Sequence, residues 1–190
     1  LFLRDPEAHG YIGRPCYHFV DALPPGCSAP LWTSHRYSEE VVNALSEQVQ
    51  RLAQHYNRQR IELVGFSGGG TLALLISARV AQVRKVVTIA APLDPHAWTA
   101  FHTLLPLSGS LSPLTVSRSS RAEELHLMGA RDTVVPPALA REYQTRFPDA
   151  ALRIIDDFSH HCCWESYWPN LLQQTDRNRT PRATLTPEPL

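Results

Sequence analysis

The sequence predicts an α/β protein with a mostly parallel sheet and helices on both of its faces. Short apolar segments of strand length recur four times along the chain, separated by stretches with helical spacing or by a longer excursion. The segment 83–90 does not alternate between apolar and polar residues, as a strand with one solvent-exposed face would. The absence of this alternation is typical of a strand that is buried on both faces. Strands that alternate with helices in this way favour a parallel sheet covered by helices.

The order of the elements follows from their end signals and spacing. Ser38, with Glu39 and Glu40 behind it, provides a helix cap and an acidic first turn, and apolar residues recur at helical spacing from there to Tyr56. The first 35 residues are expected to be irregular, with partial strand character at 11–19. The remaining expected elements are strands at 61–64, 83–90, 124–129 and 151–155, and helices directly after Ser67, at 137–147 and at 164–173.

One domain of residues 1–174 accounts for these elements. Residues 92–122 contain Pro, Ser and Gly with little periodicity, and an excursion of this length inside a compact domain favours a lid or a wall of a substrate site. Trp98 and Phe101 are expected to supply apolar lining for that site, and the alternative is that they belong to a partly helical surface excursion. The polar, Pro-rich tail at 175–190 is expected to be disordered.

Composition argues against some classes of partner but does not indicate the cellular compartment of the protein. The chain of 190 residues has 18 acidic and 18 basic residues, so neither nucleic acid nor an anionic membrane surface is indicated as a partner. No segment reads as a signal peptide or a transmembrane span. Because the chain starts at Leu1 without an initiator Met, we expect an N-terminal truncation, and the sequence predicts neither the cellular location nor the oligomeric state.

A serine lies at the expected turn between the 61–64 strand and the helix after it. The residues there are G-F-S-G-G, centred on Ser67, which is the G-x-S-x-G pattern of a nucleophile elbow. A sharp turn exposes the nucleophile and needs neighbours without bulky side chains, and the helix start favours negative charge on the hydroxyl. The backbone N–H of Gly68 is expected to donate to an oxyanion, with Phe66 as the second candidate for the oxyanion hole.

Two phosphate-binding loops compete with this interpretation. A P-loop ends with a Lys followed by Ser or Thr, and no Lys precedes Thr71. A dinucleotide fingerprint has G-x-G-x-x-G spacing, which Gly65, Gly68 and Gly70 do not give. The strand before Ser67 and the helix after it match the context of a nucleophile elbow instead.

Three of the loops at the carboxyl ends of the expected strands carry a serine, an acid and a histidine. They are Ser67, Asp132 and either His160 or its neighbour His161, and ligands of such sheets bind at these loops. A neutral imidazole takes the serine proton near pH 7, while a buried carboxylate orients the imidazole and stabilises its charged form. The order serine, acid, histidine along the chain is the one expected after a nucleophile elbow.

Other acids and histidines compete for these roles. Asp94 follows the strand before Asp132 and is the alternative acid, whereas Asp156 and Asp157 precede the histidines too closely to serve. Four further histidines are expected to be ordinary loop residues: His18, His35, His96 and His102.

The four cysteines form two groups in the sequence. Cys16 and Cys27 bracket a ten-residue loop and are candidates for a small disulfide. Cys162 and Cys163 are adjacent, and adjacent cysteines rarely form a comfortable disulfide. Metal binding by this pair with the two histidines before it is a weaker alternative, because no C-x-x-C spacing supports it. We therefore predict no metal and no other cofactor.

The segment from the Ile61 strand to the Trp164 helix resembles the α/β-hydrolase superfamily. The motifs that carry the resemblance are G-F-S-G-G, G-A-R-D-T-V-V-P-P and F-S-H-H-C-C-W. The chain also resembles a bacterial group of these hydrolases, with segments like Y-I-G-R-P-C-Y and L-W-T-S-H-R-Y-S and a terminal motif like F-x-H-x-C-C-W. That terminal motif implies that His160, rather than His161, is the base.

The resemblance implies the α/β-hydrolase fold and a serine hydrolase that acts on carboxylic esters or related acyl groups of a small molecule. Peptidases and thioesterases of the same superfamily are alternatives, and so is a non-catalytic binding domain that keeps the fold. The full fold begins with several strands and an oxyanion-hole loop, often with His-Gly, upstream of a region like 1–19. His9-Gly10 lies too near the R-P-C segment to be that loop, so the first strands are expected to be missing.

Overall fold

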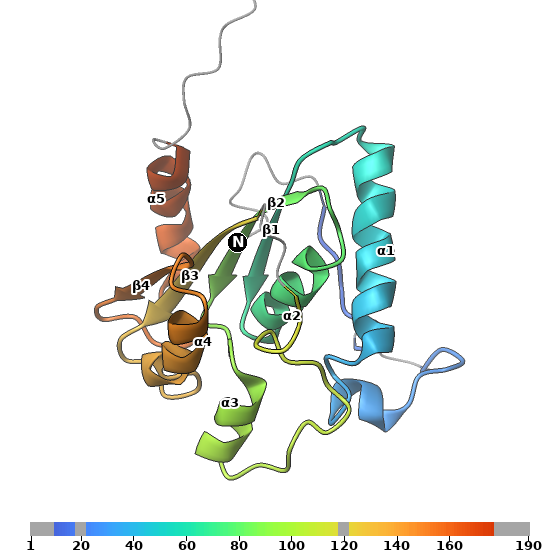
Figure 1. Ribbon diagram of the computed structural model, residues 1–190, viewed down its shortest axis with the longest axis horizontal. Coiled ribbons are helices and arrows are strands. Elements are labelled where there is room, and N and C mark those ends of the chain that lie inside the picture. Colours follow the sequence, from blue (N-terminus) through green and yellow to red (C-terminus); the bar gives the residue numbers. More distant parts are fainter. Residues whose placement is uncertain (1–9, 18–21, 118–121, 177–190) are drawn as a thin grey trace, which may run out of the picture.

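Four parallel strands form one sheet in the order β1-β2-β3-β4. The computed structural model describes residues 10–17, 22–117 and 122–176, and Figure 1 gives their arrangement. All three strand pairings are parallel, so every strand ends at the same edge of the sheet. The predicted α/β class with a parallel sheet is confirmed. The strands are β1 (Ile61–Phe66), β2 (Val83–Ile89), β3 (Glu123–Gly129) and β4 (Ala151–Ile155).

The register of the sheet places the strand ends side by side. Phe66 pairs with Ile89, Ile89 with Leu127, and Gly129 with Ile155. The hydrogen bonding continues one residue past β1, where the Ser67 N–H donates to the Ile89 carbonyl at 2.8 Å. The loops that leave β1, β3 and β4 therefore begin at neighbouring positions of one edge.

Helices α1 (Glu39–His55), α2 (Gly68–Ser77) and α4 (Arg141–Arg146) pack on one face of the sheet. Ser38 caps α1 as predicted, since its hydroxyl accepts the Val41 N–H at 3.3 Å. Almost every side chain of α2 is buried, because this helix is covered by α1 on one side and by strands on the other. Each large apolar side chain buried in this way contributes about 1.5–3 kcal/mol. The core of this face includes Val42, Leu45, Leu75, Val86 and Met128.

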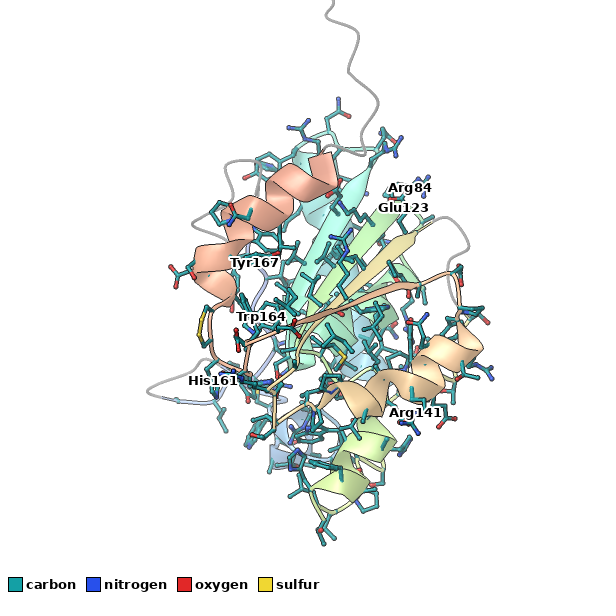
Figure 2. All side chains as sticks on the ribbon, turned by 90° about the vertical axis from the view of Figure 1, so that its left-hand side faces the viewer. Arg84, Glu123, Arg141, His161, Trp164 and Tyr167 are labelled. Atoms are coloured by element: carbon teal, nitrogen blue, oxygen red, sulfur yellow. A yellow bond between two sulfur atoms is a disulfide. The ribbon has the colours of Figure 1, made fainter. Side chains whose placement is uncertain are left out.

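Helix α5 (Trp164–Asp176) packs on the opposite face. Trp164 and Trp168 belong to a second core cluster with Ile89 and Leu127. Figure 2 shows α5 and α4 on opposite sides of the strands. Successive strand side chains point to opposite faces, so neighbouring residues of one strand belong to different cores: Val86 to the first cluster and Val87 to the second. The prediction of helices on both faces is thus confirmed. None of the described helices is long and apolar enough to cross a membrane.

The excursion at 92–122 contains a helix, α3 (Pro95–Phe101), so it is partly helical, as the alternative interpretation held. In Figure 1 it lies beyond the ends of the strands, on the side to which the arrowheads of β1 and β2 point. Farther along the excursion, the Leu111 N–H donates to the Tyr37 carbonyl at 2.9 Å, so this segment packs beside the start of α1. Residues 118–121 lie outside the described part of the chain.

Some element boundaries differ from those expected. The helix predicted at 137–147 is divided into a 3-10 turn, η3 (Pro137–Ala140), and α4. Residues 10–17 form no strand, and the rest of the 11–19 segment, His18 included, lies outside the described residues. The 3-10 turn η2 (Ala29–Trp32) precedes α1. Helix α5 runs two residues into the segment expected as a tail, of which 177–190 lie outside the described residues.

Two disulfides are present. Cys16 and Cys27 are joined with an S–S distance of 2.00 Å and a Cα–Cα distance of 5.5 Å. Cys162 and Cys163 are also joined, and the peptide bond between them is cis, with the Cα atoms 3.1 Å apart. The expectation that the adjacent cysteines stay unpaired is therefore not met.

Candidate active site

Ser67 occupies the turn between β1 and α2 in a conformation that few residues other than glycine adopt. Its φ of 51° and ψ of −127° lie outside the favoured regions for an L-residue. The turn is held by the Ser67 N–H on the Ile89 carbonyl and by the Gly70 N–H on the Ser67 carbonyl at 2.9 Å. Its side chain does not cap α2, so the hydroxyl is available to other groups.

The space that this turn requires comes from Gly65 and Gly70. A Cβ at Gly65 would overlap the carbonyl of Gly69, and a Cβ at Gly70 would lie 2.5 Å from the Cβ of Ala91. A Cβ at Gly69 would meet nothing within 4 Å. The sequence suggested that the turn needs residues without side chains at Gly65 and Gly69. The structure agrees at Gly65, but on the helix side the position without room for a side chain is Gly70 and not Gly69.

One imidazole links the serine to the acid. The His160 Nε2 lies 3.1 Å from the Ser67 Oγ, and the His160 Nδ1 lies 2.9 Å from the Asp132 Oδ2. Asp132 and His160 are 3% and 7% exposed, so water competes little for either bond. The structure thus brings the three predicted residues together, and of the two adjacent histidines it places His160 between the others.

The acid is fixed by the loop after β3. The Asp132 Oδ1 accepts the backbone N–H groups of Val134 and Val135 at 2.8 and 2.7 Å, which leaves Oδ2 for the imidazole. The carbonyl of Val134 in turn accepts the Trp98 indole N–H at 2.9 Å and lies 2.7 Å from the His102 Nε2. Helix α3 therefore supports the loop that orients the carboxylate, a role that sequence reasoning did not assign to it.

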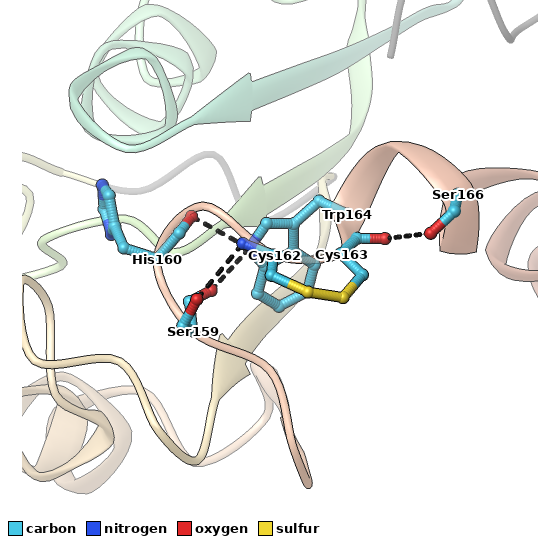
Figure 3. The surroundings of a disulfide bond; sticks show 6 residues. All are labelled: Ser159, His160, Cys162, Cys163, Trp164 and Ser166. Atoms are coloured by element: carbon cyan, nitrogen blue, oxygen red, sulfur yellow. Dashed lines mark hydrogen bonds between the residues drawn. A yellow bond between two sulfur atoms is a disulfide. The ribbon is translucent and has the colours of Figure 1, made fainter.

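The base is fixed by the turn before α5, which Figure 3 shows. The Trp164 indole N–H donates to the carbonyls of Ser159 and His160 at 3.1 and 3.2 Å. Ser159 and Cys162 exchange two further bonds, in which the Ser159 N–H donates to the Cys162 carbonyl and the Cys162 N–H to the Ser159 hydroxyl. The ring of Phe66 lies 5.1 Å from the imidazole, centroid to centroid. These contacts limit the movement of His160.

The competing residues have other contacts. Asp94, the alternative acid, caps α3: its carboxylate accepts the N–H groups of His96 and Ala97 at 2.9 and 3.1 Å. His161 is exposed and lies edge-on against the His160 ring. Asp157 pairs with Arg131 on the surface. His102, expected to be an ordinary loop residue, instead contacts the acid loop.

Trp98 and Phe101, predicted to line a substrate site, lie on α3 in different surroundings. The Trp98 indole is partly buried and bonded to the acid loop. Phe101 is 54% exposed, and its ring contacts only that of His102 among the ring pairs described. Their contact with substrate stays a prediction.

The sequence suggested two backbone N–H groups near Ser67, those of Gly68 and Phe66, as hydrogen-bond donors to the oxyanion. Gly68 begins α2, so its N–H is one of the first-turn donors that have no partner within the helix. Phe66 ends β1, and N–H groups alternate between the two edges of a strand. Because the Ser67 N–H points to β2, the Phe66 N–H lies on the other edge. Its use as a donor stays a prediction.

Among the described residues, no group of three or more His, Cys, Asp or Glu side chains is arranged to hold a metal ion. The weaker alternative of a metal at 160–163 would need thiolates, and both sulfur atoms of that segment are in a disulfide.

Three features described above are those of an α/β-hydrolase fold. They are the parallel sheet, the serine on a strained strand–helix turn, and the imidazole between that serine and a buried carboxylate. A family model described as alpha/beta hydrolase fold matches residues 16–103, the part of the chain that contains α1, the elbow and β2. The chain therefore has the α/β-hydrolase fold.

Solved structures agree with this fold. The chain is 20% identical to MGS-MChE2, an alpha/beta hydrolase enzyme from the metagenome of lagoon sediments at Mar Chica, Morocco, with a TM-score of 0.57 over 73% of this chain and 70% of that one. It is also 20% identical to the Pyrococcus furiosus esterase Pf2001, with a TM-score of 0.59 over 74% of this chain and 62% of that one.

A third solved structure is more distant in sequence and much longer. The Pyrococcus horikoshii acylaminoacyl peptidase is 12% identical to the chain, with a TM-score of 0.61 over 81% of this chain and 30% of that one. No curated protein sequence matches the chain. At these identities the structures establish the fold alone.

Proposed function

We propose that the protein is a serine hydrolase that cleaves carboxylic ester or related acyl bonds of a small molecule through an acyl-enzyme on Ser67. The observation that supports this most strongly is the unbroken chain of contacts from the Ser67 hydroxyl through both nitrogens of His160 to the Asp132 carboxylate. A serine hydroxyl is a poor nucleophile without a base in reach, and this imidazole is in reach.

The reaction follows from this geometry. Ser67 Oγ attacks the acyl carbonyl carbon while its proton passes to His160 Nε2, and the carbonyl oxygen becomes an oxyanion. The Gly68 N–H stabilises this oxyanion, with Phe66 as the second candidate donor. When the intermediate collapses, the alcohol leaves with the proton from His160. Water then attacks the acyl-enzyme with the same imidazole as base, and the acid is released.

The role of Asp132 is to hold the imidazole in the tautomer that carries its proton on Nδ1. That tautomer leaves the Nε2 lone pair toward Ser67, as general-base catalysis requires. The negative charge of the carboxylate also stabilises the imidazolium formed in the transition state. Because Asp132 has no other described charged neighbour within ion-pair distance, this stabilisation acts on His160 alone.

Labelling with a fluorophosphonate tests the nucleophile. The wild-type protein is expected to be labelled at Ser67, and Ser67→Ala is expected to lose the label. Ser46→Ala is the matched control, because Ser46 is a buried serine on α1 whose hydroxyl bonds the Val42 carbonyl. Labelling that persisted in Ser67→Ala would contradict the assignment of the nucleophile.

The class of acyl bond is tested by a panel of substrates. Turnover of p-nitrophenyl esters of graded chain length is expected, and comparison with p-nitroanilides and thioesters of the same acyl group separates an esterase from a peptidase or a thioesterase. A protein that neither reacts with the probe nor turns over any member of the panel would instead be a non-catalytic domain of this fold.

A further inference from the structure

The side chain of Tyr37, in the L-W-T-S-H-R-Y-S segment, lies directly against the first residue of α2. Tyr37 is 3% exposed. A Cβ added to Gly68 would lie 2.9 Å from the Tyr37 hydroxyl oxygen and 3.7 Å from the two nearest ring carbons. The hydroxyl is thus in close contact with the residue that follows the nucleophile, and only a glycine fits between them without a shift.

Thr71, one turn farther along α2, is buried and ties this helix to the loop after β2. The Thr71 hydroxyl donates to the Pro92 carbonyl at 2.8 Å. Burial raises the pKa of the Tyr37 phenol above its ordinary value, so the hydroxyl that faces Gly68 stays protonated over the pH range of hydrolase assays.

The backbone of Tyr37 is held by the excursion after α3. Its N–H donates to the Ser110 hydroxyl at 3.1 Å, and its carbonyl accepts the Leu111 N–H at 2.9 Å. The Ser110 hydroxyl donates in turn to the Ser34 carbonyl at 2.9 Å. The ring is therefore anchored by the excursion after α3 and cannot follow a displacement of α2 without breaking these bonds.

We propose that Tyr37 is a positioning residue for the oxyanion hole: its hydroxyl, seated against Gly68, fixes the first turn of α2 and hence the direction of the Gly68 N–H. This inference rests on the proposed function, because it matters for catalysis only if that N–H receives the oxyanion. Tyr37 does not touch the reacting atoms and acts through Gly68.

Tyr37→Phe tests the hydroxyl while the ring stays in place. Removing an oxyanion donor costs about 10²–10³-fold in kcat, so a donor that is present but loosely held is expected to cost less, roughly 3- to 20-fold, with KM changed less than twofold. Tyr143→Phe is the matched control. Tyr143 is 1% exposed and its hydroxyl donates to the Glu124 carboxylate at 2.7 Å, near the opposite end of β3. Both variants are expected to lower the unfolding midpoint, and only Tyr37→Phe to lower kcat.

A double-variant cycle tests the contact itself. Gly68→Ala places a methyl group against the Tyr37 hydroxyl and is expected to lower kcat by about 10²-fold by displacing the N–H. In the Tyr37→Phe background the same methyl group meets only ring carbons at ordinary distance, so Gly68→Ala is expected to regain at least tenfold there. A double variant no faster than Gly68→Ala would overturn the inference, as would Tyr37→Phe with wild-type kcat.

Failure of the inference and failure of the proposed function give different results. If the wild-type protein is not labelled at Ser67, the hydrolase function itself is wrong. Whatever the activity, the backbone amide resonances of Ser67 and Gly68 in a ¹⁵N-labelled sample report the contact. They are expected to shift in Tyr37→Phe and to stay in place in Tyr143→Phe. Unshifted resonances in Tyr37→Phe would show that the hydroxyl does not hold the turn.

Discussion

The His160 Nε2 lies 3.1 Å from the Ser67 Oγ although 93 positions separate the two residues in the chain. No local structure joins them: Ser67 is fixed by the turn after β1, and His160 by a turn after β4, at the far side of the sheet. Their contact depends on the loops at the edge of the sheet, so the groups that hold each loop decide whether the base meets the nucleophile.

The first prediction concerns the acid. Asp132→Asn keeps the size of the side chain but removes the charge and allows the wrong imidazole tautomer, so kcat is expected to fall by about 10⁴-fold. Asp94→Asn is the matched control, because Asp94 follows the preceding strand, is 5% exposed and only caps α3. Its kcat is expected to stay within twofold of the wild type. Steady-state kinetics on a p-nitrophenyl ester measures both, and equal losses in the two variants would contradict the assignment of the acid.

The second prediction concerns the turn that carries the base. Trp164→Phe removes the indole N–H that bonds the carbonyls of Ser159 and His160, so His160 is expected to become less ordered and kcat to fall by roughly 3- to 20-fold with little change in KM. Trp168 is an equally buried indole on the same helix, and its N–H has no hydrogen-bond partner in the described part of the chain. Trp168→Phe is therefore expected to keep kcat, while the smaller ring leaves a cavity in the core and lowers the free energy of unfolding by about 1–3 kcal/mol. A loss of kcat in Trp168→Phe as large as that in Trp164→Phe would show that α5 packing, and not the indole bond, is responsible.

The sheet and the convergence of Ser67, Asp132 and His160 could be predicted because both follow from local patterns. Four apolar segments separated by helical spacing lead to a parallel sheet, and the loops after parallel strands meet at one edge. The choice between His160 and His161 could not be made from the residues, since adjacent positions have the same pattern and only the resemblance distinguished them. In the structure His160 is buried and bonded to both partners, whereas His161 is exposed.

The roles of Asp94, Trp98 and Tyr37 were missed for different reasons. Asp94 followed by a proline is the start signal of a helix, with a cap at the Asp and Pro at the first position, and this signal could have predicted α3. Trp98 and Tyr37 act through contacts with Val134 and Gly68, which lie more than 30 positions away. Composition and periodicity carry no information about contacts of that range.

The third prediction separates the two glycines on the helix side of the elbow. Gly70→Ala places a Cβ 2.5 Å from the Cβ of Ala91 and 3.1 Å from that of Thr88, inside a packed core, and is expected to lower the free energy of unfolding by about 1–3 kcal/mol. Gly69→Ala meets nothing within 4 Å and replaces a weak helix former, so it is expected to leave stability unchanged or raise it by up to about 1 kcal/mol. Urea unfolding measures both. A Gly69→Ala variant less stable than Gly70→Ala would contradict this account of the turn.

The fourth prediction concerns acid stability. Arg79 near the end of α2 donates to both carboxylate oxygens of Glu39 in the first turn of α1, each at 2.8 Å, and this hydrogen bonding holds the pKa of Glu39 below its usual value. Because the pKa is lower in the folded than in the unfolded chain, the stabilisation is fully present above the unfolded pKa of about 4.3 and is lost as the pH falls through the folded pKa. Glu39→Gln removes the titrating group, so the loss of stability below about pH 5 is expected to be shallower than in the wild type.

Glu40→Gln is the control for this variant. Glu40 is also exposed in the first turn of α1, so its replacement removes the same charge from the helix start without breaking the bonds to Arg79. Free energies of unfolding are measured with urea between pH 3 and pH 7. Those of the wild type and Glu39→Gln are expected to converge at low pH. The free energy of Glu40→Gln is expected to depend on pH with the same slope as that of the wild type. Since the Glu39 carboxylate is exposed, 1 M salt is expected to reduce the difference at pH 7. A wild-type slope in Glu39→Gln would show that this ion pair does not contribute to the acid dependence.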